Sequence, residues 1–413
     1  MMLSPYRVLD LTDEKGFVCG KVLAELGADV IKIEKPGGDI ARNIEPFWHD
    51  IPDPEMSLYW LAHNVGKRGV TLDIERDDGQ VIFNRLVKTA DILVESFAPG
   101  YLEAIGLGYQ HCSRINPGII MTSITPHGQD GPYKDFKGYD LQAQAMGGTV
   151  YICGYPGEAP VSWGGLQAYY QAGLQAGVGT MIALWHREVT GEGEHIDVSI
   201  REAMTVLTTT EAPVADWVES GTIKQRWGGS QEDMAGGLLR WFYPCKDGYV
   251  IWRFAVGTMG HMTNSFVAWM EEEGMAANLR DEVPDWTEIG LTKVSQAQIS
   301  RWEQIFTHFF LTKTKKELLD EALKRSIILY PVSNMADVLG NAQLQSRGYW
   351  MELASPALGS SMKYPGASFK ASEAPTGLRC RAPLIGEHNK EIYVGELGYS
   401  GKQLRLLIES GIV

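Results

Sequence analysis

Basic charge is scarce in this chain of 413 residues. Its 37 lysine and arginine residues are outnumbered by 51 aspartate and glutamate residues, which gives a formal net charge of -14 at pH 7. Nucleic-acid binding depends on basic side chains that displace the counterions of the phosphate backbone. The composition therefore argues against a DNA or RNA partner. An anionic ligand would have to be bound by individual lysines and helix N-termini.

Cysteine is also rare, and its five residues are scattered along the chain at Cys19, Cys112, Cys153, Cys245 and Cys380. A disulfide framework or a structural zinc site needs clustered cysteines. The nine histidines show no metal-ligand spacing either. We therefore expect reduced thiols and no metal.

Long apolar runs are missing as well. The most apolar stretch, residues 172–185, is interrupted by Gln175 and is too short to span a bilayer. The N-terminus lacks a basic region followed by an apolar run, so no secretory signal is expected. These features predict a cytoplasmic protein without a membrane segment.

The chain opens with a strand–helix–strand pattern. Residues 7–11 and 29–34 are short apolar runs typical of buried strands, and residues 17–26 between them carry apolar side chains at helical spacing. This pattern predicts an α/β fold with a doubly wound parallel sheet. A dinucleotide site of the nicotinamide type is not expected, because the first turn offers only Gly16 and Gly20 in place of Gly-x-Gly-x-x-Gly.

Candidate binding residues follow the predicted strands. Ligands of open α/β sheets gather beyond the carboxyl ends of the strands. We therefore expect four residues to line one crevice: Lys35, Leu72, Ser96 and Phe97.

Later segments suggest the domain organisation. Residues 166–185 form a helix lined with glycine and alanine, which we expect to be central and fully buried. Composition changes after Gly221, where tryptophan and methionine become frequent. We predict a large domain from residues 1–221 and 331–413, with a smaller α+β domain, residues 222–330, inserted into it.

Two segments carry a resemblance to a known family. One is residues 7–42, which contain the core Leu-Gly-Ala-Asp-Val-Ile-Lys-Ile-Glu at residues 26–34, and the other is Gly138-Tyr139-Asp140. Both resemble the family III CoA-transferases, which include formyl-CoA and carnitine CoA-transferases and acyl-CoA racemases. The resemblance implies coenzyme A or acyl-CoA as substrate, a small carboxylic acid as acceptor and two chains that interlock as a dimer. It also implies CoA contacts at Lys35, Leu72, Ser96, Phe97, Lys137, Glu14 and Lys15.

The resemblance also implies a nucleophile that this chain lacks. Family members attack the thioester with an aspartate at the start of the small-residue helix, and the corresponding position here holds Tyr169. A phenol, with an ordinary pKa of about 10, is mostly protonated at neutral pH. The racemase branch uses a histidine where this chain has Tyr139.

Three hypotheses follow. The first is a transferase subunit whose paralogous partner supplies the aspartate, as in heteromeric family members of anaerobic aromatic degradation. The second is a self-sufficient transferase that uses a displaced carboxylate, with Asp140 as the main candidate and Glu158 as another. The third is a structural or regulatory pseudoenzyme that binds CoA without turnover.

Overall fold

The computed structural model of the chain describes most of its residues, and these form two compact units. The described ranges are 1–209, 217–223, 225–232, 237–291, 294–355 and 358–413. The first unit comprises residues 1–150, 162–222 and 342–413, and the second comprises 151–161 and 223–341. The sequence-based boundaries at 221/222 and 330/331 remain predictions of where independent domains begin and end.

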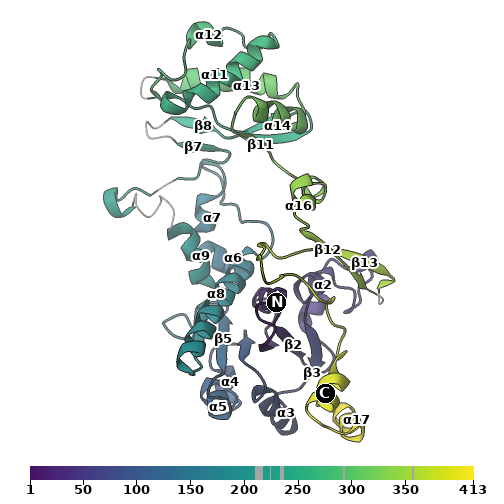
Figure 1. Cartoon of the computed structure of the whole chain (residues 1–413). Helices are drawn as coiled ribbons and strands as arrows, with labels where there is room; N and C mark the ends of the chain where they lie inside the picture. The colour runs from purple at the N-terminus through teal and green to yellow at the C-terminus, as the bar shows by residue number, and fades with distance from the viewer. Residues whose placement is uncertain (210–216, 224, 233–236, 292–293, 356–357) are drawn as a thin grey trace. The chain divides into compact units, whose positions relative to one another are not determined.

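A six-stranded parallel sheet forms the centre of the first unit, with strand order β3-β2-β1-β4-β5-β6 (Figure 1). The strands are β1 Arg7–Leu11, β2 Asp29–Glu34, β3 Arg68–Thr71, β4 Ile92–Glu95, β5 Ile120–Thr125 and β6 His195–Ser199. The chain winds outward from β1 in one direction and from β4 in the other. The predicted α/β class with a doubly wound parallel sheet is therefore confirmed.

Helices cover both faces of this sheet. Val8 of β1 packs in a core with α1 and α8, whereas Leu9 packs in a second core with α3 and the C-terminal helix α17. Figure 1 shows the C-terminus and α17 near β3. The helices of this unit are α1 Phe17–Glu25, α2 Leu58–His63, α3 Asp77–Val87, α4 Tyr101–Ala104, α5 Tyr109–Ile115, α6 Asp140–Met146, α8 Gln167–Thr190, α9 Ile200–Thr209, α16 Ala342–Ser346 and α17 Gly401–Glu409, while α7 Thr149–Ile152 crosses into the second unit. Strands β12 Trp350–Ser355 and β13 Ser360–Pro365 form an antiparallel pair.

Helix α8 has two different faces. Its small residues let it approach α1 closely, since a Cβ atom on Gly173 would lie 2.7 Å from Cβ of Val18. The other face carries exposed apolar side chains at helical spacing: Leu174, Val178, Ile182, Trp185 and Val189. The prediction that this helix is fully buried was wrong, because its small residues mark only the face that packs on the unit's own core.

Buried ion pairs lie beside the carboxyl ends of β1 and β2. The Nζ atom of Lys67 lies 2.7 Å from a carboxylate oxygen of Asp10, and neither side chain is exposed. Gly20 makes room for this pair, because a Cβ atom there would lie 2.2 Å from an Asp10 oxygen. Arg42 donates two hydrogen bonds to Glu34 at 2.6 and 2.8 Å. These contacts hold the loops that follow the strands in fixed positions.

The second unit has its own aromatic core, with Trp252, Trp286, Trp302 and Phe306 buried in it. Strands β9 Phe242–Cys245, β10 Gly248–Trp252 and β11 Leu329–Pro331 form an antiparallel sheet, and β7 Ser230–Glu232 pairs with β8 Leu238–Arg240. Its helices are α11 Gly260–Glu272, α12 Leu279–Glu282, α13 Gln296–Phe310, α14 Lys315–Lys324 and α15 Met335–Leu339. In neither unit does the described part of the chain contain a helix with the length and apolarity needed to cross a membrane.

Candidate functional site

Two cavities lie at the carboxyl edge of the parallel sheet. The first has a volume of about 300 Å³ and the second about 310 Å³. Ser96 and Phe97 line both, so the loop after β4 is their common wall. The winding direction of the sheet reverses between β1 and β4, which is where open α/β sheets hold their ligands. The two cavities are therefore candidate parts of one site.

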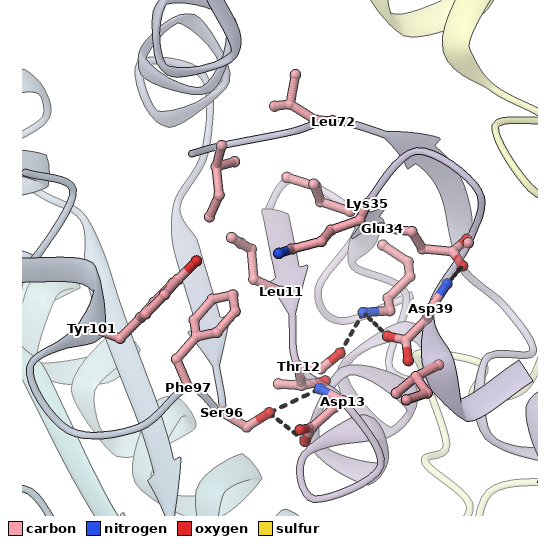
Figure 2. A pocket seen from close by; sticks show the side chains of 15 residues that line it. Leu11, Thr12, Asp13, Glu34, Lys35, Asp39, Leu72, Ser96, Phe97 and Tyr101 are labelled. Carbon is pink, nitrogen blue, oxygen red and sulfur yellow. Dashed lines mark hydrogen bonds and ion pairs between the residues drawn. The ribbon is translucent and has the colours of Figure 1, made fainter. Parts of the chain in front are cut away.

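The loops after four strands form the first cavity (Figure 2). It contains four of the predicted contact residues, Lys35, Leu72, Ser96 and Phe97. Leu72 and Phe97 supply apolar surface, and the Phe97 ring stacks on Tyr101 with ring centroids 4.7 Å apart and an angle of 29° between the rings. Such walls suit a flat, partly apolar ring system.

Hydrogen bonds fix the shared wall. The Glu95 carboxylate accepts a hydrogen bond from the Phe97 N–H at 2.7 Å. Ser96 Oγ donates to the Asp13 carboxylate and accepts from the Asp13 N–H, both at 2.8 Å, and Figure 2 shows these two bonds. Burial raises the pKa of Glu95 to about 7, although hydrogen bonds from Ser123 and Phe97 favour its ionised form. Hydrogen bonds between Asp13 and Ser96 thus connect the loops that follow β1 and β4, next to Phe97.

The lysines of the first cavity are paired with acids. Lys32 is buried, its Nζ atom lies 3.3 Å from an Asp39 oxygen and it also donates to the Thr12 carbonyl. Burial disfavours the charge of Lys32, but Asp39 and other nearby acids outweigh burial and raise its pKa. Lys35 is more exposed, and its Nζ atom lies 2.9 Å from a Glu75 oxygen.

The second cavity contains the predicted residues of the reaction centre. Glu14, Lys15, Lys137, Tyr139 and Tyr169 all line it, together with Ser96 and Phe97. The structure therefore brings Glu14, Lys15 and Lys137, the remaining predicted contact residues, to the same side of the shared wall as Tyr169.

Tyr169 lies in the first turn of α8 and is only 3% exposed. Its backbone N–H donates a hydrogen bond to Asp140 at 3.1 Å. Burial raises the pKa of the Tyr169 phenol, and the negative charge of Glu14 raises it further. Both effects favour the protonated phenol at neutral pH, in which the hydroxyl can donate a hydrogen bond.

Asp140 contacts the start of α8. One of its carboxylate oxygens accepts the Tyr169 N–H, and the other accepts a hydrogen bond from the Gln144 side chain at 2.5 Å. The side chain is 5% exposed. Because the first N–H groups of a helix have no partner within the helix, an acid at this place caps α8. This geometry supports a structural role for Asp140, the main candidate nucleophile of the second hypothesis.

Glu14 is the carboxylate that lines the second cavity together with Tyr169. The neighbouring Lys15 pairs with Asp13, and no ion pair of Glu14 is found in the described ranges. Burial raises the pKa of Glu14, and Asp13 contributes to the increase. Glu158, the other displaced carboxylate considered from sequence, is exposed and belongs to the second unit.

Sequence reasoning missed several contributors to the site. Glu95, Asp13 and Tyr101 support its walls without an obvious motif of their own. Glu95 ends β4 and Asp13 closely follows β1, so a position at the end of a strand is the signal that could have found them. For metals, no group of three or more histidine, cysteine, aspartate or glutamate side chains with suitable geometry occurs among the described residues.

The fold and the cavities define an α/β protein with a candidate ligand site at the switch point of its sheet. Residues 3–389 match the model of CoA-transferase family III, and the chain belongs to this family. It is 35% identical over 410 residues to subunit BbsE of the succinyl-CoA:(R)-benzylsuccinate CoA-transferase of Thauera aromatica, covering 99% of this chain and 98% of the relative.

Two further relatives agree with this assignment. A formyl-CoA:oxalate CoA-transferase of Streptomyces avermitilis is 30% identical, with 100% of this chain and 99% of the relative covered. The crystal structure of a CAIB/BAIF family protein from Brucella suis matches with a TM-score of 0.79 and 27% identity, over 94% of this chain and 98% of the other. The predicted family is therefore confirmed, and CoA thioesters are its substrates.

Proposed function

We propose that the chain is a subunit of a family III CoA-transferase whose paralogous partner supplies the nucleophilic aspartate. The observation that carries this proposal is the burial of Tyr169, a phenol with a raised pKa at the position expected for the acid. The similarity to a relative named as a subunit supports it. The same relative makes succinyl-CoA the proposed donor and (R)-benzylsuccinate the proposed acceptor.

The two cavities suggest how the subunit holds a CoA thioester. The adenine ring would lie between Leu72 and Phe97 in the first cavity, with Lys35 near a phosphate. The pantetheine arm would pass along the Ser96–Phe97 wall into the second cavity, where Lys137 lies. The thioester end would then reach the neighbourhood of Tyr169.

The chemistry requires a carboxylate. In the partner, an aspartate would attack the thioester carbon and displace CoA thiolate, which gives a mixed anhydride. The thiolate would attack the aspartyl carbonyl and release the first acid, and the acceptor acid would then take over the CoA group. A tyrosine with its ordinary pKa would have to be ionised at a cost of about 4 kcal/mol at pH 7. In this chain, burial of Tyr169 increases that cost.

The exposed face of α8 supports the presence of a partner chain. Leu174, Ile182 and Trp185 are 48%, 62% and 70% exposed and lie on one face of the helix. Contiguous apolar surface of this kind marks an interface. We propose that the partner covers this face in an interlocked dimer.

The test compares two preparations. The chain is purified alone and after co-expression with an aspartate-bearing paralogue, and CoA transfer from succinyl-CoA to (R)-benzylsuccinate is measured in both. We expect activity only in the mixed preparation. Full specific activity of the chain alone would overturn the proposal, and CoA binding without turnover in both would favour the pseudoenzyme hypothesis.

One observation favours a second candidate, the self-sufficient transferase. Glu14 lines the second cavity beside Tyr169 and has no ion pair in the described chain, whereas both oxygens of Asp140 are occupied. If the Glu14 carboxylate formed the covalent intermediate with acyl-CoA, hydroxylamine would cleave this intermediate and leave a hydroxamate on the Glu14 side chain. Mass spectrometry of the wild type and of Glu14→Gln would locate this adduct. We expect no adduct on this chain.

A further inference from the structure

A network of three residues spans the rim of the first cavity. The Lys35 Nζ atom lies 2.9 Å from a Glu75 oxygen, and the Tyr101 hydroxyl donates a hydrogen bond to the same oxygen at 2.5 Å. Lys35 follows β2, Glu75 follows β3 and Tyr101 follows β4. Glu75 therefore connects loops that come from both halves of the sheet.

The network is joined to the aromatic wall. Tyr101 stacks on Phe97, whose backbone is held by Glu95. In Figure 2 the Lys35 amine and the Tyr101 hydroxyl point toward one another above the Phe97 ring. The carboxylate that bridges these two groups therefore lies at the mouth of the cavity.

This arrangement leaves the cavity poor in available positive charge. Lys32 is paired with Asp39 and Lys35 with Glu75, so no lysine that lines the first cavity lacks an acid in the described chain. Asp13 and Glu34 also line the cavity, and they pair with Lys15 and Arg42, so the lining gains no free positive charge from those two cations. A phosphate that approaches Lys35 must displace Glu75 or lie beside its carboxylate, and like charges at that distance repel.

We propose that Glu75 is a specificity-determining residue that weakens binding of a CoA nucleotide with a phosphate at this rim, compared with the same nucleotide lacking that phosphate. The inference rests on the proposed function, because it takes a CoA-type nucleotide as the ligand of the first cavity. The Lys35 and Glu75 side chains are 60% and 47% exposed, so solvent screens their charges and the effect is moderate.

The experiment uses two ligands that differ by one phosphate, coenzyme A and dephospho-coenzyme A. Isothermal titration calorimetry gives their dissociation constants for the full chain and for two variants. Glu75→Gln removes the charge at the rim and keeps the size of the side chain. Asp78→Asn removes the same charge from the exposed first turn of α3 and serves as the matched control.

We expect Glu75→Gln to bind coenzyme A about two- to fivefold more tightly, with a smaller gain for dephospho-coenzyme A. The difference between the ligands should shrink at high salt, because the residues are exposed. Asp78→Asn should leave the ratio of the two affinities unchanged. An equal gain for both ligands, or none, in Glu75→Gln would overturn the inference and leave the proposed function standing. Absence of binding of either ligand to all three proteins would overturn the CoA-binding part of the proposed function, and this inference with it.

Discussion

The two cavities on either side of the Phe97 wall differ in how their charged groups are satisfied. In the first, Lys32 and Lys35 each have an acid partner. In the second, Glu14 has no ion pair within the described ranges, and the buried Tyr169 lines the cavity at the position where we propose that the reactive acid is missing. The wall and the binding surface arise from loops that the sheet brings together, whereas the chemistry depends on a single side chain at the start of α8. Under the proposed function, the chain has lost the reactive group and has kept the architecture that surrounds it.

The largest expected effect comes from the buried ion pair of Asp10 and Lys67 beside the carboxyl end of β1. Lys67→Met should destabilise the first unit by about 3–5 kcal/mol, because it leaves the Asp10 carboxylate buried without its partner. Urea unfolding measures the loss. The double variant Asp10→Asn/Lys67→Met should recover part of it, and a single variant as stable as the wild type would show that the pair does not support this cavity.

The next prediction concerns Glu95, which lies beneath the wall that both cavities share. Its pKa rises from the ordinary value of 4.5 to about 7 in the folded chain. The folded state therefore binds a proton that the unfolded chain releases, so the contribution of Glu95 to stability falls as pH rises from about 4.5 to about 7.

Glu95→Gln should remove this dependence. Relative to the wild type, the variant should gain up to about 3 kcal/mol of stability between pH 4.5 and pH 8. Urea unfolding at several pH values measures the difference between the two proteins. If the free energy of unfolding changed with pH in the same way in both proteins, the raised pKa of Glu95 would be contradicted.

A smaller effect is expected at the start of α8 in the second cavity. Asp140→Ala should cost about 1–3 kcal/mol, because the Tyr169 N–H and the Gln144 amide lose their acceptor. Asp140→Asn retains one acceptor oxygen and should cost less. Thermal unfolding measures both. If Asp140→Asn kept the stability of the wild type but abolished an activity of the purified chain, Asp140 would be a reactive group and not a cap.

The smallest effect is expected for Tyr169→Phe. The ring still fills its buried position, so the free energy of unfolding should change by less than about 1 kcal/mol. CoA transfer by the complex with the partner should remain unchanged, which an assay of initial rates can check. A large loss of activity would mean that the Tyr169 hydroxyl contacts the reacting group. The second cavity would then take part in the chemistry, contrary to the proposal.

The sequence allowed the sheet, and with it much of the candidate site, to be predicted. Short apolar runs located β1 and β2, and the rule that ligands gather at strand ends predicted that Lys35, Leu72, Ser96 and Phe97 line one cavity. The exposed face of α8 was not predicted, because glycine and alanine indicate close packing but not how many faces of a helix are packed.

By itself, the sequence determined the family and the α/β class, and it predicted that a phenol stands at the position of the nucleophile. These depend on residue identity and on spacing within short segments. Only the tertiary structure decided that Glu75 neutralises Lys35, 40 residues away, and that Asp140 caps the helix through Tyr169, 29 residues away. Such contacts join side chains from different loops, and their distances follow from the packing of the whole sheet and its helices.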